Sequence, residues 1–534
     1  MNNNALRILY ARRAFFYTHS NQILYLLLLN IMFMSIVNRK AIVMRNKVLF
    51  FCLILLTCCT HIQAQKANNI YFMKHNPLRH ELNPSFMPEE GFRGFLGFPA
   101  MTSLDMGFSD NSYIFNDLCK VKNGELVTVF DNDSDLGLRY LLTSAHKSVK
   151  LDMYGDVGLF NLGIKKNDTY WMFGAKTKFE MNTSLPTQII KDILEIVDNG
   201  ARNTSHKFEK FAIAASLYNE YSMGVAHKFG QITIGGKLKF LQGYANMKSD
   251  MQDLQLDIVN DHWKLTGAAE LYFLVNGMKL YKDGNSITVE DEESDNPMDL
   301  LKSNGYGLAM DLGANMKLGD RIRLSASVID LGFIKWKQKA NKLSADLDIE
   351  FDMPARTEDQ SVGDYLDKLQ EVLSDATDED NYDYWVEDKP VSYRSMLSTK
   401  FYAGVEFSWL EDKMSASLLS KTWIYNGNGR QDLVLAWNAR PAKFFDCVIS
   451  YDILNGHFGS LGYGMNFNAG PINFFVTMDD IPLRYSDKIK SGGSSYRIPS
   501  HLSQVHFSMG LNFLIGWRKS DTETDKSKFV YESL

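Results

Sequence analysis

Hydrophobic and polar positions alternate along much of this chain, most regularly near its C-terminal end. From residue 505 to residue 517 every second side chain is apolar, and all the intervening residues except Leu514 are small or polar. Such a period of two places alternate side chains on opposite faces of an extended strand. The pattern predicts a terminal strand with one lipid-facing side, made of Val505, Phe507, Met509, Leu511, Phe513, Ile515 and Trp517.

The same alternation recurs in paired segments that are joined by short turns, among them Gly230-Gln231, Gly319-Asp320 and Gly470-Pro471. Long polar connections separate the pairs, at residues 121–150, 282–302, 341–398 and 481–500. Short turns at one end and long loops at the other are typical of a transmembrane β-barrel. A soluble β-sandwich also has alternating strands, but the length of these strands favours the barrel. We therefore predict an all-β fold, a transmembrane antiparallel β-barrel of about 14 strands (range 12–16).

Two apolar runs precede the alternating region, at residues 21–37 and 48–59. The second follows Arg45 and Lys47 and ends near a small residue, which predicts a secretory signal over residues 44–64 that is cleaved between Ala64 and Gln65. The first run is short for a bilayer span, which favours an over-extended start and translation from Met44. An inner-membrane anchor and a lipoprotein acylated at Cys58 or Cys59 are the alternatives.

The segment after the predicted cleavage site combines apolar side chains with Pro77, Pro84 and Pro88, which exclude a regular strand or helix. Because such a segment would be insoluble in water, we expect it to fold inside the barrel as a plug, with Arg79, Glu81, Asn83 and Pro84 as candidate plug residues. We expect its removal (residues 69–88) to leave a folded barrel of higher conductance. The predicted organisation is residues 1–43 as extra N-terminal sequence, 44–64 as signal, 65–90 as plug, 91–518 as barrel and 519–534 as polar tail.

Composition and motifs restrict the possible chemistry. The net charge of −6 leaves no basic surface for nucleic acid. Gly456 to Gly462 contains Ser460 but lacks a glycine two positions before it, as a nucleophile elbow requires. The acidic residues 375–388 lack EF-hand spacing. We therefore predict no enzyme activity, no metal and no cofactor. Two cysteines, Cys119 and Cys447, are too few for a disulfide framework. Apart from the strands, helical spacing predicts two loop helices, at residues 186–197 and 362–374.

Several segments resemble a known family: NIYFM at 69–73, RHELNPSFMP at 79–88, GFSDNS at 107–112, GGKLKF at 235–240 and SASVIDLGFIKW at 325–336. Together they resemble an uncharacterised outer-membrane barrel family of Bacteroidota, a domain of unknown function, over nearly all of the mature chain. More distantly, Leu82-Asn83-Pro84-Ser85-Phe86 is similar to the Asn-Pro-Ala segment of fatty-acid-transporter-like barrels. That likeness implies 14 strands and an N-terminal plug, although Ser85 replaces the alanine.

Two hypotheses of function follow for a barrel that is expected in the cell outer membrane, with membrane lipid and the outer-membrane assembly machinery as partners. The first is a transporter or pore for small hydrophobic molecules. The second is a non-transporting barrel that serves as a partner or attachment component in protein secretion or at the cell surface. An apolar tunnel from lumen to wall would favour the first, whereas a filled lumen with a large, shaped outer surface would favour the second.

Overall fold

The computed structural model describes residues 68–89, 91–110, 119–122, 125–128, 148–186, 203–208, 211–276, 278–283, 286–291, 302–337, 340–353, 368, 371–372, 383–386, 391–425, 428–454, 457–482, 485, 487–491, 494–497 and 504–517. The predicted helix at 186–197 begins at the last residue of a strand and otherwise lies outside these ranges, as does most of the one at 362–374. No helix in the described ranges is long and apolar enough to cross a membrane.

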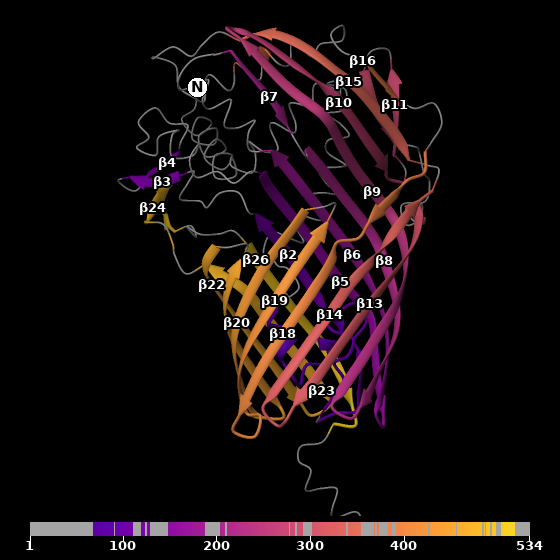
Figure 1. Ribbon diagram of the computed structural model, residues 1–534, viewed down its shortest axis with the longest axis vertical. Coiled ribbons are helices and arrows are strands. Elements are labelled where there is room, and N and C mark those ends of the chain that lie inside the picture. The colour runs from indigo at the N-terminus through magenta and orange to yellow at the C-terminus, as the bar shows by residue number, and fades with distance from the viewer. Residues whose placement is uncertain are drawn as a thin grey trace, which may run out of the picture.

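A closed antiparallel barrel of 14 strands forms the body of the molecule (Figure 1), which confirms the predicted fold class. The first strand is interrupted and consists of β1 (Gly94–Gly97) and β2 (Leu104–Asp110), both of which pair with the last strand, β26 (Gln504–Ile515), and so close the barrel. The other strands, in order around the wall, are β5 (Ser148–Lys166), β6 (Thr169–Pro186), β8 (Phe211–Phe229), β9 (Ile232–Val259), β13 (Gly305–Leu318), β14 (Ile322–Trp336), β18 (Thr399–Trp409), β19 (Met414–Tyr425), β20 (Asn428–Ala442), β21 (Phe445–Leu454), β22 (His457–Ala469) and β23 (Ile472–Pro482).

Short turns join these strands at the lower end of the barrel in Figure 1, at the predicted positions. Gly230, Gly319 and Gly470 have φ values of 62°, 64° and 64°, a left-handed conformation in which a side chain would be strained. The long connections all leave from the opposite end. The alternation is retained as well, since Phe507, Met509 and Leu511 of β26 point outward while Ser508, Gly510 and Asn512 are buried.

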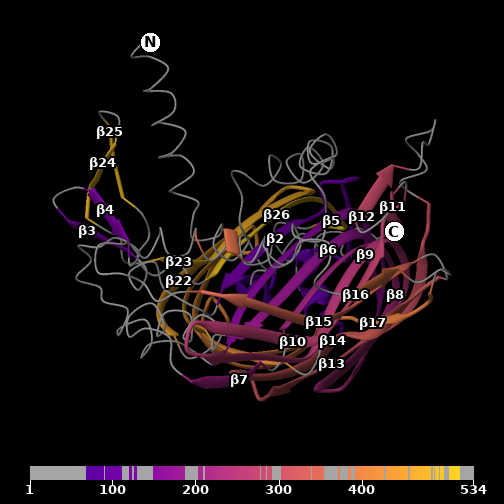
Figure 2. The same cartoon turned by 90° about the horizontal axis from the view of Figure 1, so that it is seen from above.

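The sheet of the barrel continues above the wall on one side, and we call this extension the upper sheet. The strand β9 has 28 residues, and its upper half pairs with β10 (His262–Leu274) and β7 (Thr204–Phe208). The strand β15 (Asn341–Asp352) pairs with β10 and with β16 (Asp383–Val386). Seen from above, β7, β10 and β15 lie on the same side of the barrel as β13 and β14 (Figure 2). These strands extend past the barrel wall, which explains why residues 247–282 lack a lipid-facing pattern.

The remaining described strands are short. The strand β17 (Arg394–Met396) pairs with β14, and three separate hairpins are formed by β3 (Cys119–Lys122) with β4 (Glu125–Thr128), β11 (Met278–Asp283) with β12 (Ser286–Asp291) and β24 (Ile489–Ser491) with β25 (Ser494–Tyr496).

Candidate functional site

The N-terminal segment, residues 68–89, lies inside the lower half of the barrel. It contains two single-turn 3₁₀ helices, η2 (Asn68–Phe72) and η3 (Pro77–Glu81). Pro77 is tolerated because it stands in the first turn, where its missing N–H needs no partner, and the Asn76 side chain caps the helix by accepting a hydrogen bond from the Leu78 N–H at 2.8 Å. Residues 68–88 are buried except Lys74 and His75, which are half-buried.

An apolar core forms between this segment and the inner wall. Tyr71 meets Phe86 edge-on at 4.9 Å between ring centroids and stacks on Tyr402 of β18 at 5.8 Å. The Arg79 guanidinium lies 4.2 Å from the Phe86 ring centroid, and its Nε donates to the Tyr71 carbonyl at 3.0 Å. The barrel wall therefore shelters the apolar side chains that would make this segment insoluble in water.

The Asn-Pro-Ser turn is bonded directly to the barrel wall. Asn83 Nδ2 donates to the Ala326 carbonyl at 3.1 Å, and Asn83 Oδ1 accepts from the Ser85 N–H at 3.0 Å. Pro84 fits because Gly235 has no side chain: a Cβ there would lie 2.3 Å from the Pro84 carbonyl oxygen. A Cβ on Gly313 would similarly lie 2.1 Å from Asn83 Oδ1. Two glycines in neighbouring strands thus provide the space that brings this turn against the wall.

The side of the segment that faces β5 and β6 is polar. Glu81 forms an ion pair with Lys176 and accepts from Asn161 Nδ2 at 2.7 Å. His80 lies beside Phe95 and Tyr170, and neither of its ring nitrogens has a hydrogen-bond partner in the described part of the chain. Burial holds the pKa of His80 well below its usual value, so the ring is neutral at neutral pH.

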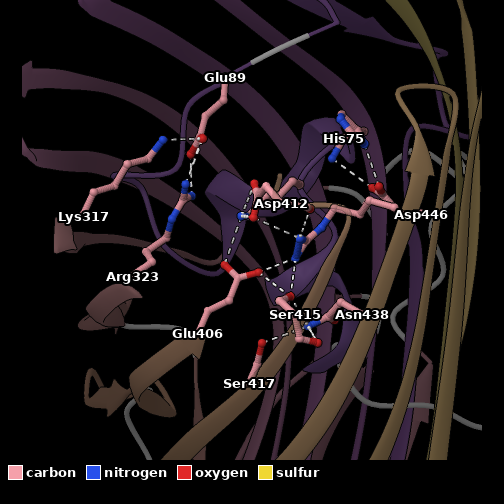
Figure 3. A network of polar contacts seen from close by, with 12 residues as sticks. His75, Glu89, Lys317, Arg323, Glu406, Asp412, Ser415, Ser417, Asn438 and Asp446 are labelled. Atoms are coloured by element: carbon pink, nitrogen blue, oxygen red, sulfur yellow. Dashed lines mark hydrogen bonds and ion pairs between the residues drawn. The ribbon is translucent and has the colours of Figure 1, made fainter. Parts of the chain in front are cut away.

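Ion pairs attach the segment to the lower rim of the barrel (Figure 3). The Lys74 ammonium lies 2.6 Å from Asp412, in the turn between β18 and β19, and 3.4 Å from Glu406. Although burial alone would raise it, the pKa of Asp412 lies below its usual value because Lys74 stabilises the carboxylate. We call these ion pairs the lower ionic ring, which also includes Glu89 with Lys317 at 2.9 Å and Glu89 with Arg323 at 2.8 Å. Beside the ring, His75 Nδ1 is hydrogen-bonded to Asp446 at 2.6 Å.

A layer of charged side chains fills the lumen above the segment. Its centre is Asp330 of β14, whose carboxylate is contacted by Lys178 at 3.2 Å, Lys239 at 2.5 Å and Lys400 at 3.0 Å. These lysines come from β6, β9 and β18, and Glu220 and Asp311 complete what we call the ionic layer. Higher still, Trp336, Tyr218, Leu241 and Leu397 belong to a buried apolar cluster.

The outer wall is hollowed where the Asn83–Pro84 turn lies behind it. Ala314, Ala326 and Ala403 are paired neighbours on β13, β14 and β18. Because these alanines are short, they leave a mainly apolar hollow of about 570 Å³, bordered by larger residues such as Ile234, Leu312 and Phe401. The hydrogen-bonded ladder is continuous through the three alanines, so this is a hollow in an intact wall.

The structure places all four candidate plug residues inside the barrel. Glu81, Asn83 and Pro84 contact the wall, whereas Arg79 bonds within the segment, to the Tyr71 carbonyl and over the Phe86 ring. Trp517 differs from its expected place on the lipid face. The strand ends at Ile515, Gly516 takes a φ of 68°, and Trp517 packs against the buried core of the N-terminal segment. The predicted signal cleavage site between Ala64 and Gln65 lies outside the residues that the structure describes.

The ionic layer and the lower ionic ring were not identified from sequence. The sequence of β6 does indicate a charged lumen. Lys176, Lys178 and Glu180 occupy the inward positions of this strand, whereas its outward positions include Trp171 and Phe173. In the described ranges, no group of three or more His, Cys, Asp or Glu side chains is arranged to hold a metal ion. Cys447 is a free thiol.

Comparisons with known proteins identify a family but no activity. The model of one family, described as a family of unknown function (DUF5723), matches residues 84–479. No curated protein matches this chain.

Solved structures with a similar fold are barrels of low sequence identity. The toluene transporter TbuX of Ralstonia pickettii is 7% identical, with 82% of this chain and 94% of that chain covered and a TM-score of 0.35. A Pseudomonas aeruginosa FadL homologue is 11% identical, with 85% and 98% covered and a TM-score of 0.32. The translocator domain of the autotransporter NalP from Neisseria meningitidis is 8% identical, with 82% and 93% covered and a TM-score of 0.27. Likenesses this slight support no inference about what this chain carries or binds.

Proposed function

This chain belongs to the family of unknown function DUF5723, and we propose a function for it from its structure. We propose that it is a non-conducting outer-membrane barrel, which presents its upper sheet to a protein partner at the cell surface. The observation that carries the proposal is the filled lumen. The N-terminal segment and the ionic layer follow one another along the barrel axis, and their side chains are buried. Above them, the apolar cluster around Trp336 packs on one side of the lumen, against β8, β9, β13 and β14.

The upper sheet supports the second half of the proposal. Barrels of the outer membrane have their longer loops on the extracellular side, which supports an extracellular position for this sheet. Its strands present charged side chains to solvent: Lys264 contacts Asp348 at 2.7 Å and Glu350 at 2.6 Å on the neighbouring strand, and all three are exposed. A paired sheet that rises above the barrel wall offers a partner more surface than short loops would.

Two measurements test this function. Purified protein in planar bilayers should show no stable channel openings, and discrete openings of the unmodified protein would contradict a closed barrel. In cells, a photo-crosslinking residue at Glu350 should give a discrete protein adduct, whereas the same residue at Asp320, in an exposed turn at the other end, should not. The absence of a specific adduct at several exposed upper-sheet positions would exclude the partner role.

A second candidate function is transport of small hydrophobic molecules, and the wall hollow at Ala326 favours it. The hollow is apolar and lies directly outside the Asn83–Pro84 turn, where only backbone separates the segment from lipid. Mass spectrometry of molecules that co-purify in mild detergent tests this candidate. If the hollow binds cargo, Ala326→Trp should remove the bound compounds, whereas Ala416→Trp, at an exposed alanine of β19, should retain them. Identical profiles from both variants would exclude the hollow as a binding site.

A further inference from the structure

One aromatic contact in the described part of the chain joins opposite sides of the barrel. Tyr154 of β5 and Trp423 of β19 meet edge-on with 6.2 Å between ring centroids. Six strands separate β5 from β19 in either direction around the wall, counting β1 and β2 as one. These two strands therefore lie opposite each other, and their rings meet across the lumen. We call this pair the aromatic bridge.

The ionic layer adjoins the aromatic bridge. Lys400, which is bonded to Asp330, also places its ammonium 5.8 Å from the centroid of the Trp423 ring, a cation–π distance. Lys178 reaches the same Asp330 from β6, although β8, β9 and β13 lie between the two strands. Charged side chains thus span the β6–β18 half of the lumen, and the aromatic bridge crosses its middle.

The backbone of β14 is distorted at the centre of this layer. The register between β13 and β14 shifts between Met310 and Leu312, and Asp330 in the resulting bulge has a φ of 61°. Left-handed backbone is rare for residues other than glycine, and bulges commonly redirect a side chain. Here the bulge turns both Ile329 and Asp330 inward, where Asp330 is 0% exposed.

These contacts are separate from those of the N-terminal segment. The lysines that contact the Asp330 carboxylate, Lys178, Lys239 and Lys400, belong to the barrel wall, as does Asp311, which accepts from the Asp330 N–H. A small polar cavity, lined by His80 and Glu81 on one side and by Glu220, Lys239 and Asp311 on the other, separates the segment from the layer. Removal of the segment would therefore leave the layer and the bridge with their own partners.

We propose that the ionic layer and the aromatic bridge form a second closure of the lumen, which keeps the barrel shut even when the N-terminal segment is absent. The proposal rests on the proposed non-conducting function and replaces the expectation that deletion of the segment alone raises conductance. A solute path along the axis would need both barriers to open.

The second closure is tested by measuring the conductance of four proteins in planar bilayers. They are the full chain, a chain that lacks residues 68–88, the double variant Asp330→Gly/Trp423→Ala, and a chain that carries both the deletion and the double substitution. Glycine accepts the positive φ at position 330, so this change removes the carboxylate without straining the bulge. Channel openings are expected only from the combination. Openings from the segment deletion alone would overturn the proposal, whereas openings from the unmodified protein would instead contradict the non-conducting function. Asp330→Asn with Trp423→Phe, which retains the shape of the first side chain and an aromatic ring at the second position, is the matched control and should remain closed when combined with the deletion.

A labelling experiment avoids the deletion in case that chain fails to assemble. His80→Cys, in a chain whose Cys119 and Cys447 are replaced by Ser, places a thiol in the cavity beneath the layer. A small charged maleimide added to intact cells should leave this thiol unmodified, and should modify it when Asp330→Gly and Trp423→Ala are added. Glu350→Cys, exposed on the upper sheet, is the positive control. A His80→Cys thiol that reacts with the layer intact, or that stays unreactive in the heat-modifiable folded Asp330→Gly/Trp423→Ala chain, would overturn the proposal.

Discussion

At the scale of single residues, Asn83 shows how one side chain joins the N-terminal segment to the barrel. Its amide donates to the Ala326 carbonyl and accepts from Ser85. Loss of a buried hydrogen-bonded group costs about 1–3 kcal/mol because its partners stay unsatisfied. Asn83→Ala should therefore lower the temperature at which the folded barrel loses its faster electrophoretic mobility. Gln231→Ala, in an exposed turn, should have no effect, and equal shifts would show that the Asn83 contacts do not stabilise the barrel.

Asp412 gives a prediction about pH. A carboxyl whose folded pKa is lowered contributes stability above its unfolded pKa and loses that contribution as the pH falls through the folded pKa. The pKa of Asp412 is lowered because Lys74 outweighs the effect of burial. The stability difference between the wild type and Asp412→Asn should be full at neutral pH and should disappear as the pH falls below the usual Asp value of about 4. A difference that is independent of pH in urea titrations would exclude the ion pair as its cause.

At the scale of elements, the terminal strand β26 closes the barrel and exposes one apolar face. Met509 pairs with Leu104 on one side and Val476 on the other, in the middle of the strand, whereas Ile515 is its last residue. An arginine on the lipid face costs about 2–4 kcal/mol at the bilayer midplane and about 0–1 kcal/mol near the interface. Met509→Arg should therefore reduce the folded, heat-modifiable fraction much more than Ile515→Arg. Equal losses would contradict the depth that we assign to Met509.

The inner face of β26 tolerates large side chains less well than its alternating pattern alone suggests. An inward position in a water-filled lumen would accept Arg, but Ser508 is 0% exposed and donates to Asp105. The lumen there is packed, so Ser508→Arg would have to displace neighbouring side chains and should also reduce folding. The same packing explains the place of Trp517, which turns from the lipid face to cover the end of the apolar core.

At the scale of the whole molecule, the start of the N-terminal segment bears on processing. Asn68 is 0% exposed, and both it and Asn69 bond to Asp479 inside the barrel. Protein extracted from outer membranes should begin at Gln65 or its cyclised form, only a few residues before this buried position. Intact-mass measurement checks this. A chain that retains residues 1–43 would contradict both the cleavage and the start at Met44.

The sequence alone determined the fold class, the short turns and the outward faces of the strands. A lipid-facing strand must repeat every two residues whatever its neighbours are, and Gly230 or Gly470 marks a turn from its own conformational freedom. Tertiary structure decided what fills the lumen beyond the N-terminal segment. Lys178, Asp330 and Lys400 are distant in sequence, and Tyr154 meets Trp423 only because closure of 14 strands sets β5 opposite β19. Local patterns carry no information about such contacts, because they depend on the circumference of the barrel and the register of every strand between them.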